Sequence, residues 1–171
     1  MSDLRGRYEF RSIRPEEGEE AADIELICFP PNEACSREAT TERAKKAPEF
    51  FIVAKDKETG KIAGSLTGLA TAENAFRDEF FVNADLNDPK GKNIMLLSLC
   101  VRPEYRGQGL ARELMTEYIR REKANGRSRL YLTCLDDKVK MYSKMGYKDL
   151  GISGSVWGGQ TWHDMSYDIK S

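Results

Sequence analysis

The chain has 171 residues, of which 40% are hydrophobic and 32% are charged, and its 27 basic residues nearly balance its 28 acidic ones. This is the composition of an ordinary globular protein, and the length suits one domain, which we expect to span residues 1–171. The net charge of -1 argues against a nucleic-acid partner, and no apolar run is long enough to cross a membrane.

The first half of the chain predicts one strand, two helices and a β-hairpin. Alternating polar and apolar residues indicate the strands, and apolar residues at helical spacing indicate the helices. The expected elements are a strand at 8–13, helices at 15–29 and 36–46, and hairpin strands at 49–56 and 61–71. Pro30 and Pro31 end the first helix, and Ser36 is the expected cap of the second. The polar stretch at 73–92 predicts a loop with room for one helical turn.

The second half begins with a nearly continuous apolar run at 93–101, which is typical of a central strand covered on both faces. A helix over 110–124 follows and ends at Asn125 and Gly126. The remaining elements are a strand at 128–135, a short helix at 137–145 and strands at 147–152 and 161–169. No repeat or linker divides the chain, so the order of elements predicts one α/β domain.

The turn before the helix at 110–124 carries two glycines and an arginine, in the stretch RGQGLA at 106–111. A helix start exposes amide N–H groups and a partial positive charge. Glycines let a phosphate approach these groups closely, and Arg106 adds a fixed charge. The stretch is therefore a candidate diphosphate-binding turn, although a plain strand-to-helix turn also uses glycine. It lacks the Gly-Lys-Ser/Thr ending of a P-loop and the third glycine of the dinucleotide fingerprint.

The stretch LCVRPEYRGQGLARELM, followed by MYSKMGY, strongly resembles the GNAT superfamily of acyl-CoA-dependent N-acetyltransferases. Arg106, Gly109 and Ala111 fill the family's Arg/Gln-x-x-Gly-x-Gly/Ala turn, and Tyr142 takes the tyrosine position ahead of a Gly-Tyr pair. The resemblance runs over residues 8–169. It implies the GNAT fold, a mixed central sheet of about six to seven strands that has helices on both faces and splays at the acyl-CoA site.

A narrower resemblance is to the arylalkylamine and polyamine N-acetyltransferase branch, through ICFPPNEACSREA before APEFFIVAKD. Vertebrate arylalkylamine enzymes place histidines on the strand before the coenzyme turn, whereas this chain has Met95 and Leu97 at the matching positions. The only histidine, His163, falls in the last strand, and Leu135 replaces the polar residue that often precedes the tyrosine helix. The general base of the branch therefore does not carry over intact.

The resemblance implies acetyl-CoA as co-substrate. Backbone groups of the strand at 99–101 would bind the pantetheine arm, and the backbone at 107–112 would hold the pyrophosphate. The expected coenzyme-binding residues are Leu99, Cys100, Val101, Arg106, Gly107, Gln108, Gly109, Leu110, Ala111 and Arg112.

The implied reaction is direct transfer of an acetyl group to a primary amine, with a small arylalkylamine or polyamine as the expected acceptor. A peptide or protein amine, or a non-catalytic acyl-CoA-binding module, are the alternatives. The loop at 76–89 mixes acids with three phenylalanines, which would suit a cationic or aromatic substrate. The same composition also fits a solvated loop whose phenylalanines pack under the sheet.

Two residues are candidates for the proton transfers. The leaving thiolate, with a parent pKa near ~8.5, gains from a proton donor, and the resemblance gives this role to Tyr142. Otherwise Tyr142 is a core aromatic, as we expect for Tyr131 and Tyr147. An alkylamine, with a pKa near ~10.4, must lose a proton before it attacks. Glu33 is the first candidate base, because its loop forms one wall of the amine site in the branch. Alternatively, Glu33 caps a helix or is a solvated surface acid, and a water chain to solvent removes the proton.

Metal chemistry is not expected. The chain has one histidine, and its four cysteines, Cys28, Cys35, Cys100 and Cys134, include no CxxC pair, so we expect no metal site and mostly buried, reduced thiols. A covalent route through Cys134 would need an exposed thiol with a lowered pKa. The charged first ten residues lack a secretory signal, so we expect a cytoplasmic protein, as a monomer or homodimer.

Overall fold

The computed structural model describes residues 4–169, so both ends of the expected domain, residues 1–3 and 170–171, lie outside the described residues. Its centre is a seven-stranded sheet in the order β1-β2-β3-β4-β5-β7-β6. The strands are β1 Tyr8–Ser12, β2 Phe51–Asp56, β3 Ile62–Thr71, β4 Asn93–Val101, β5 Arg129–Leu135, β6 Lys148–Ile152 and β7 Trp162–Asp168. Neighbouring strands are antiparallel, except that β4 and β5 are parallel. The prediction of a mixed sheet is confirmed.

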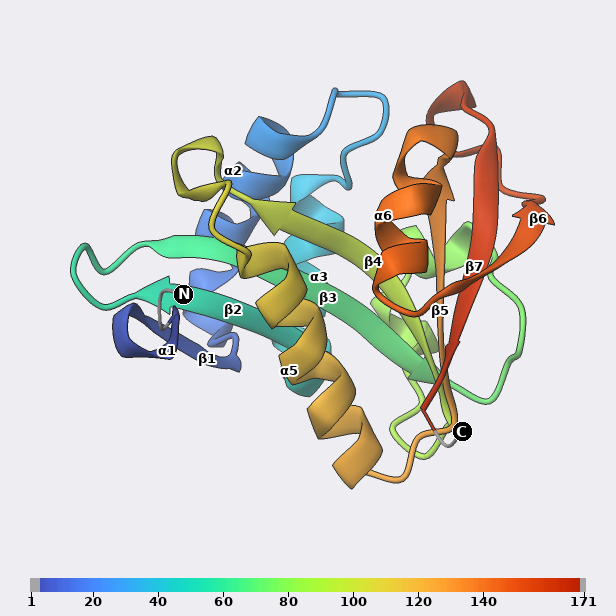
Figure 1. Ribbon diagram of the computed structural model, residues 1–171, viewed down its shortest axis with the longest axis horizontal. Coiled ribbons are helices and arrows are strands. Elements are labelled where there is room, and N and C mark those ends of the chain that lie inside the picture. The colour runs from blue at the N-terminus through green and yellow to red at the C-terminus, as the bar shows by residue number, and fades with distance from the viewer. Residues whose placement is uncertain (1–3, 170–171) are drawn as a thin grey trace.

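Helices cover both faces of the sheet. They are α1 Leu4–Arg7, α2 Gly18–Cys28, α3 Arg37–Lys46, α4 Glu79–Val82, α5 Leu110–Ala124 and α6 Val139–Lys144. Figure 1 shows α5 and α6 in front of the sheet, and α2 and α3 behind it. Within residues 4–169, none of these helices combines the length and the apolar character that crossing a membrane requires.

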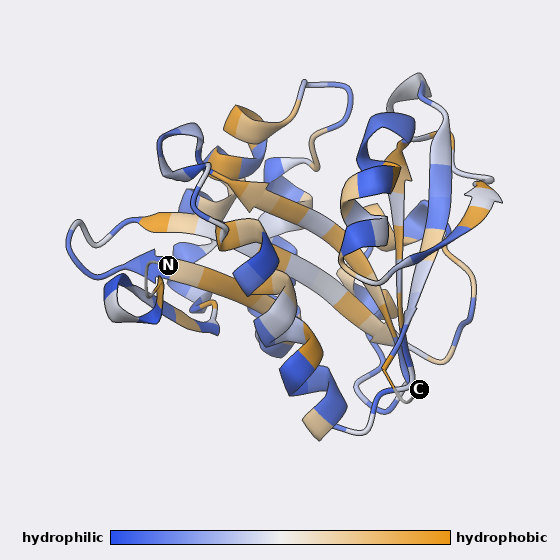
Figure 2. Ribbon diagram, viewed as in Figure 1, coloured by the Kyte–Doolittle hydropathy of each residue, from blue (hydrophilic) through white to orange (hydrophobic). Residues whose placement is uncertain are grey.

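The core lies between the sheet and these two helix layers, and Figure 2 shows the apolar residues concentrated in the strands. Under α5, Leu114 and Tyr118 are fully buried, and the Tyr118 hydroxyl donates a 2.8 Å hydrogen bond to the carbonyl of Phe50. Tyr131 and Tyr147, which were expected in the core, are 5% and 4% exposed.

The structure differs from the sequence prediction mainly at element ends. Helix α1 was not predicted, because four residues are too few to show a helical period. The helix expected from residue 15 opens as a 3-10 turn, and its regular part begins at Gly18. The loop at 73–92 holds α4 and a 3-10 turn. The cap at Ser36 is confirmed, since its hydroxyl accepts a 3.0 Å hydrogen bond from the amide of Ala39.

Strands β4 and β5 separate after a short paired stretch, and this separation positions the site. Only residues 93–95 of β4 pair with β5, and the two strands then diverge (Figure 1). On its other edge β4 stays paired with β3, with a bulge. Thr67 faces Ser98 and Gly68 faces Leu96, so Leu97 is an extra residue in β4. The backbone of β4 beyond the bulge is therefore open on the side of β5.

One prediction concerns acid stability. Glu17, just before α2, accepts hydrogen bonds of 2.8 and 2.9 Å from Arg11 and one of 3.1 Å from Lys55. The Arg11 hydrogen bonds outweigh burial and lower the pKa of Glu17 from 4.5 to about 2. A lowered pKa stabilises the fold above the unfolded-state pKa, and this contribution is lost as the pH falls towards the folded-state value. We expect Glu17→Gln to lower the free energy of unfolding most at neutral pH, and the deficit to shrink between pH 4.5 and about 2.

Urea unfolding over a pH series measures this difference. Glu16→Gln is the matched control, because the exposed Glu16 makes none of these bonds. A deficit in Glu17→Gln that does not change with pH would contradict the assignment.

Candidate active site

The glycine turn joins the end of β4 to the start of α5. Gly107 and Gly109 have φ angles of 84° and 90°, a left-handed conformation that favours glycine, and Gly109 caps α5 without a side-chain hydrogen bond. Within the described chain, the amide N–H groups of residues 107–112 have no protein acceptor. Gly107, Gly109 and Leu110 also line a cavity. Free N–H groups at the positive end of a helix dipole suit an anionic group such as a diphosphate.

Side chains of the turn hold its shape. The Arg106 Nε donates a 2.9 Å hydrogen bond to the carbonyl of Val101, and so closes the turn against the end of β4. Gln108 Nε2 donates to the Tyr8 hydroxyl at 3.0 Å and to the Tyr105 carbonyl at 2.8 Å. These hydrogen bonds hold the backbone of the turn in one conformation, and so they fix the orientation of its free N–H groups.

The cavity has a volume of about 550 Å³ and lies where β4 and β5 diverge. Its walls come from β4 after Met95, the second half of β5, the end of α2, the glycine turn and α6. Of the predicted site it brings together Glu33, Leu99, Val101, Arg106, Gly107, Gly109, Leu110, Ala111 and Tyr142. Cys100, Gln108 and Arg112 do not line it: Cys100 packs against α2, and Arg112 lines a smaller hollow beside α5. These three residues were predicted to bind the coenzyme through their backbone groups, which belong to β4 and to the glycine turn whichever way the side chains point.

Tyr142 reaches the cavity from α6. Its ring packs edge-on against Tyr147, with 5.7 Å between centroids, and its hydroxyl has no hydrogen-bond partner among the described residues. Burial, followed by electrostatic interactions with the Cys134 and Cys100 thiols, raises the pKa of Tyr142 above its usual value of 10. The hydroxyl therefore keeps its proton at neutral pH and can donate it. Burial also raises the pKa of Cys134 to about 12, which disfavours the covalent route through that thiol.

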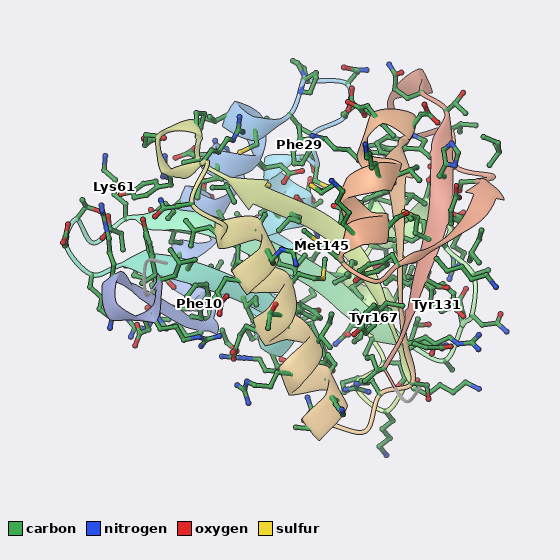
Figure 3. All side chains as sticks on the ribbon, in the orientation of Figure 1. Phe10, Phe29, Lys61, Tyr131, Met145 and Tyr167 are labelled. Carbon is green, nitrogen blue, oxygen red and sulfur yellow. The ribbon has the colours of Figure 1, made fainter. Side chains whose placement is uncertain are left out.

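The cavity also has an aromatic wall. Trp157 stacks obliquely on Phe81 with 4.6 Å between ring centroids, and Trp162 Nε1 donates a 2.8 Å hydrogen bond to the carbonyl of Trp157. Phe29, which follows α2 and is labelled in Figure 3, adds a third aromatic segment to the lining. The sequence reasoning missed both tryptophans. Their spacing in VWGGQTW, as the chain's only two tryptophans, was the available signal.

Glu33 lies beside this wall. Trp157 Nε1 donates a 2.9 Å hydrogen bond to the Glu33 carbonyl, and Asn32 Nδ2 donates a 3.0 Å bond to the carbonyl of Gly158. The Glu33 side chain is half-buried, lines the cavity and has no partner among the described residues. It does not cap α3, because Ser36 takes that position.

Acids of the loop at 76–89 were possible substrate contacts, but the structure places two of them elsewhere. Asp78 accepts hydrogen bonds from the Ser155 hydroxyl, at 2.5 Å, and from the Val156 amide, at 3.1 Å. Asp85 forms a 2.9 Å ion pair with Lys46 on the surface. Neither lines the cavity.

Glu25 of α2 is a cavity residue that the sequence did not reveal. It is 4% exposed, and its carboxylate accepts hydrogen bonds from the Cys35 amide at 2.9 Å and from the Ser98 hydroxyl at 2.5 Å. It stands in an acidic helix, GEEAADIELIC, where one more glutamate looks like a solvated residue. Its only sequence signal is its place beside Ile24 and Cys28 on the apolar face.

Cys28, one turn further along α2, also lines the cavity, and its thiol donates a 3.3 Å hydrogen bond to the Val101 carbonyl. Hydrogen bonding with Cys100, opposed by burial and assisted by Arg106, lowers the pKa of Cys28 to about 6. The end of α2 therefore places a thiol with a lowered pKa next to the glycine turn.

Comparisons with known proteins agree with this geometry. A family model described as "Acetyltransferase (GNAT) family" matches residues 18–147. No curated protein matches the sequence. Similar solved structures include the loading GNATL domain of CurA from Lyngbya majuscula, at a TM-score of 0.82 and 16% identity, covering 95% of this chain and 98% of that chain.

Two further solved structures are similar to this chain. The GphF GNAT-like decarboxylase in complex with isobutyryl-CoA has a TM-score of 0.78 and 18% identity, covering 95% of this chain and 100% of that one. The ribosomal-protein-S18-alanine N-acetyltransferase from Escherichia coli has a TM-score of 0.69 and 17% identity, covering 96% of this chain and 95% of that one. At such identities the likeness shows a shared fold.

Proposed function

Because the chain belongs to the acetyltransferase (GNAT) family of acyl-CoA N-acyltransferases, we propose that it transfers an acetyl group directly from acetyl-CoA to a small arylalkylamine. The observation that carries the proposal is the cavity, since it joins the glycine turn, Tyr142 and the aromatic wall in one space of about 550 Å³. The structural relative that holds isobutyryl-CoA supports an acyl-CoA in a fold of this kind.

The coenzyme would lie along the diverging edge of β4. The free N–H groups at 107–112 would hold the pyrophosphate, and the backbone at 99–101, which does not pair with β5, would bind the pantetheine arm as an added strand would. An N–H group of this stretch of β4 would face the thioester oxygen and stabilise the oxyanion that forms there.

The amine would enter between Glu33 and the aromatic wall. Glu33, whose carboxylate has no partner among the described residues, takes a proton from the ammonium ion, and the neutral nitrogen attacks the thioester carbonyl. The new C–N bond forms and the C–S bond breaks, and Tyr142 gives its proton to the departing sulfur. The acylated nitrogen loses its second proton, Glu33 returns its proton to solvent, and solvent reprotonates Tyr142.

The composition of the acceptor side favours an arylalkylamine over a polyamine. Phe29, Phe81, Trp157 and Trp162 supply aromatic surface, and aromatic faces also attract a cation. A polyamine carries several separated ammonium groups, each of which needs an acid. Asp78 and Asp85 would be the natural partners in the neighbouring loop, but both are engaged elsewhere.

A thiol-release assay with acetyl-CoA tests the proposal against tryptamine, phenethylamine, spermine, spermidine, and peptides with a free N-terminus or a lysine. We expect turnover with tryptamine or phenethylamine to exceed turnover with the other amines. Preference for a peptide would place the chain with protein acetyltransferases. No thiol release with any amine, while acetyl-CoA still binds, would contradict the proposal and favour a non-catalytic acyl-CoA-binding module.

A further inference from the structure

Glu25 and Ser98 line the same cavity, and the reaction proposed above uses neither. We propose that Ser98 and Glu25 form a proton relay that removes the second proton from the amine nitrogen, after the nitrogen has attacked the thioester. The inference rests on the proposed function of the cavity and adds a catalytic residue, Ser98, and a positioning residue, Glu25.

The stoichiometry of amide formation requires a second proton acceptor. An ammonium ion and acetyl-CoA give an N-substituted acetamide, free CoA thiol and one proton. The nitrogen loses one proton before attack and another afterwards, because attack leaves it positively charged, while the sulfur gains one proton. If Glu33 takes the first proton, it is occupied when the second must leave, so a separate acceptor near the reacting carbon keeps the steps in order.

Ser98 lines the cavity next to the stretch of β4 that would face the thioester. It follows the bulged Leu97 on the stretch of β4 that has left β5, and Leu97 and Leu99 line the cavity on either side of it. Its hydroxyl donates a 2.5 Å hydrogen bond to Glu25 Oε2. The Cys100 thiol lies 3.1 Å from that hydroxyl and takes at most one of its two lone pairs, so one is left for the substrate nitrogen. Ser98 would accept the nitrogen's proton while passing its own to Glu25, so one proton moves and Ser98 is unchanged.

Glu25 is held firmly by neutral groups. One carboxylate oxygen accepts the Cys35 amide at 2.9 Å, and the other accepts Ser98 and the Cys100 thiol, the latter at 3.2 Å. No lysine or arginine among the described residues forms an ion pair with it. Buried acids with a purely structural role are usually paired with a cation. Glu25 instead is oriented by hydrogen bonds and not by an ion pair.

The other titratable groups around Glu25 are thiols and one arginine. Cys28 comes from its own helix, Cys35 from the following loop and Cys100 from β4. Arg43 of α3 is 2% exposed, and its charge lowers the pKa of the Cys35 thiol, whereas the charge of Glu25 raises it. The guanidinium nitrogens of Arg43 have no hydrogen-bond partners among the described residues. Arg43 is therefore a charge close to this cluster that forms no ion pair with Glu25.

Steady-state kinetics of Ser98→Ala, Ser98→Thr and Glu25→Gln, with the best amine of the panel, test the relay. We expect Ser98→Ala and Glu25→Gln to lower kcat by roughly 100-fold at an unchanged KM for acetyl-CoA. Ser98→Thr, which keeps the hydroxyl, should recover most of the rate. The dependence of kcat on pH in the first two variants should differ from that of the wild-type enzyme, because one proton acceptor of the bound complex is gone. Glu33→Gln should move the profile of kcat/KM to higher pH.

The outcomes separate the relay from the proposed function. If the wild-type enzyme turns over an amine and Ser98→Ala keeps its kcat, the relay is overturned while the function stands. A slower Ser98→Ala with the wild-type pH profile also overturns it, because a packing defect would leave that profile in place. If the wild-type enzyme turns over no amine, the proposed function fails and the relay fails with it. Because Ser98→Ala is a small change, the test holds even if Glu25→Gln does not fold.

Discussion

Replacing Tyr142 with phenylalanine is expected to lower kcat by roughly 100-fold, while acetyl-CoA binds with unchanged affinity. The substitution removes only the hydroxyl, which faces the cavity without a protein partner among the described residues. Because the pKa of Tyr142 is raised by burial, the wild-type hydroxyl is protonated and able to donate to the leaving thiolate. The ring itself stays packed against Tyr147. Steady-state kinetics and calorimetric titration with acetyl-CoA measure the two effects separately.

Tyr147→Phe is the matched control. Tyr147 is also buried, its ring lies beside that of Tyr142, and its hydroxyl contacts the sulfur of Met115 at 3.1 Å rather than the cavity. We expect this variant to keep its kcat even if it melts at a lower temperature. Full activity in Tyr142→Phe would remove Tyr142 from the reaction. Equal losses of kcat in both variants would show that these hydroxyls support activity through packing and not through proton donation.

The coenzyme side of the site could be predicted from the sequence because it is encoded locally. An apolar strand, two glycines and an amphipathic helix follow one another at 93–124, and each has a short-range signature. The conformation of Gly109 and the missing side-chain cap of α5 are consequences of the residues in that one stretch. Backbone groups make up this half of the site, so the identity of most side chains matters little.

The acceptor side could not be predicted in the same way, because it exists only after distant segments pack together. The contact between Phe81 and Trp157 joins α4, which follows β3, to the segment between β6 and β7. The hydrogen bond between Glu25 and Ser98 joins α2 to β4, and it depends on the bulge at Leu97. A continuous apolar run hides such a bulge, since no alternation marks where the register changes. Long-range register, and not local propensity, therefore decides which acids face the cavity.

Gly109→Asp is expected to weaken acetyl-CoA binding by roughly a thousandfold. The new carboxylate would stand at the helix start that the pyrophosphate is proposed to occupy. Two like charges about 4 Å apart near a protein surface repel by about 4 kcal/mol, which corresponds to about three factors of ten in affinity. Calorimetric titration with acetyl-CoA measures the loss.

Backbone strain is the competing explanation, and Gly60→Asp isolates it. Gly60 has a φ angle of 74°, and a side chain there would meet nothing within 4 Å, just as at Gly109. Both variants therefore carry a similar strain and the same charge, but Gly60 lies in the exposed turn between β2 and β3. We expect similar falls in melting temperature, with binding lost only in Gly109→Asp. Wild-type affinity in Gly109→Asp would refute the turn as the pyrophosphate site, because a carboxylate among the N–H donors would repel a bound pyrophosphate.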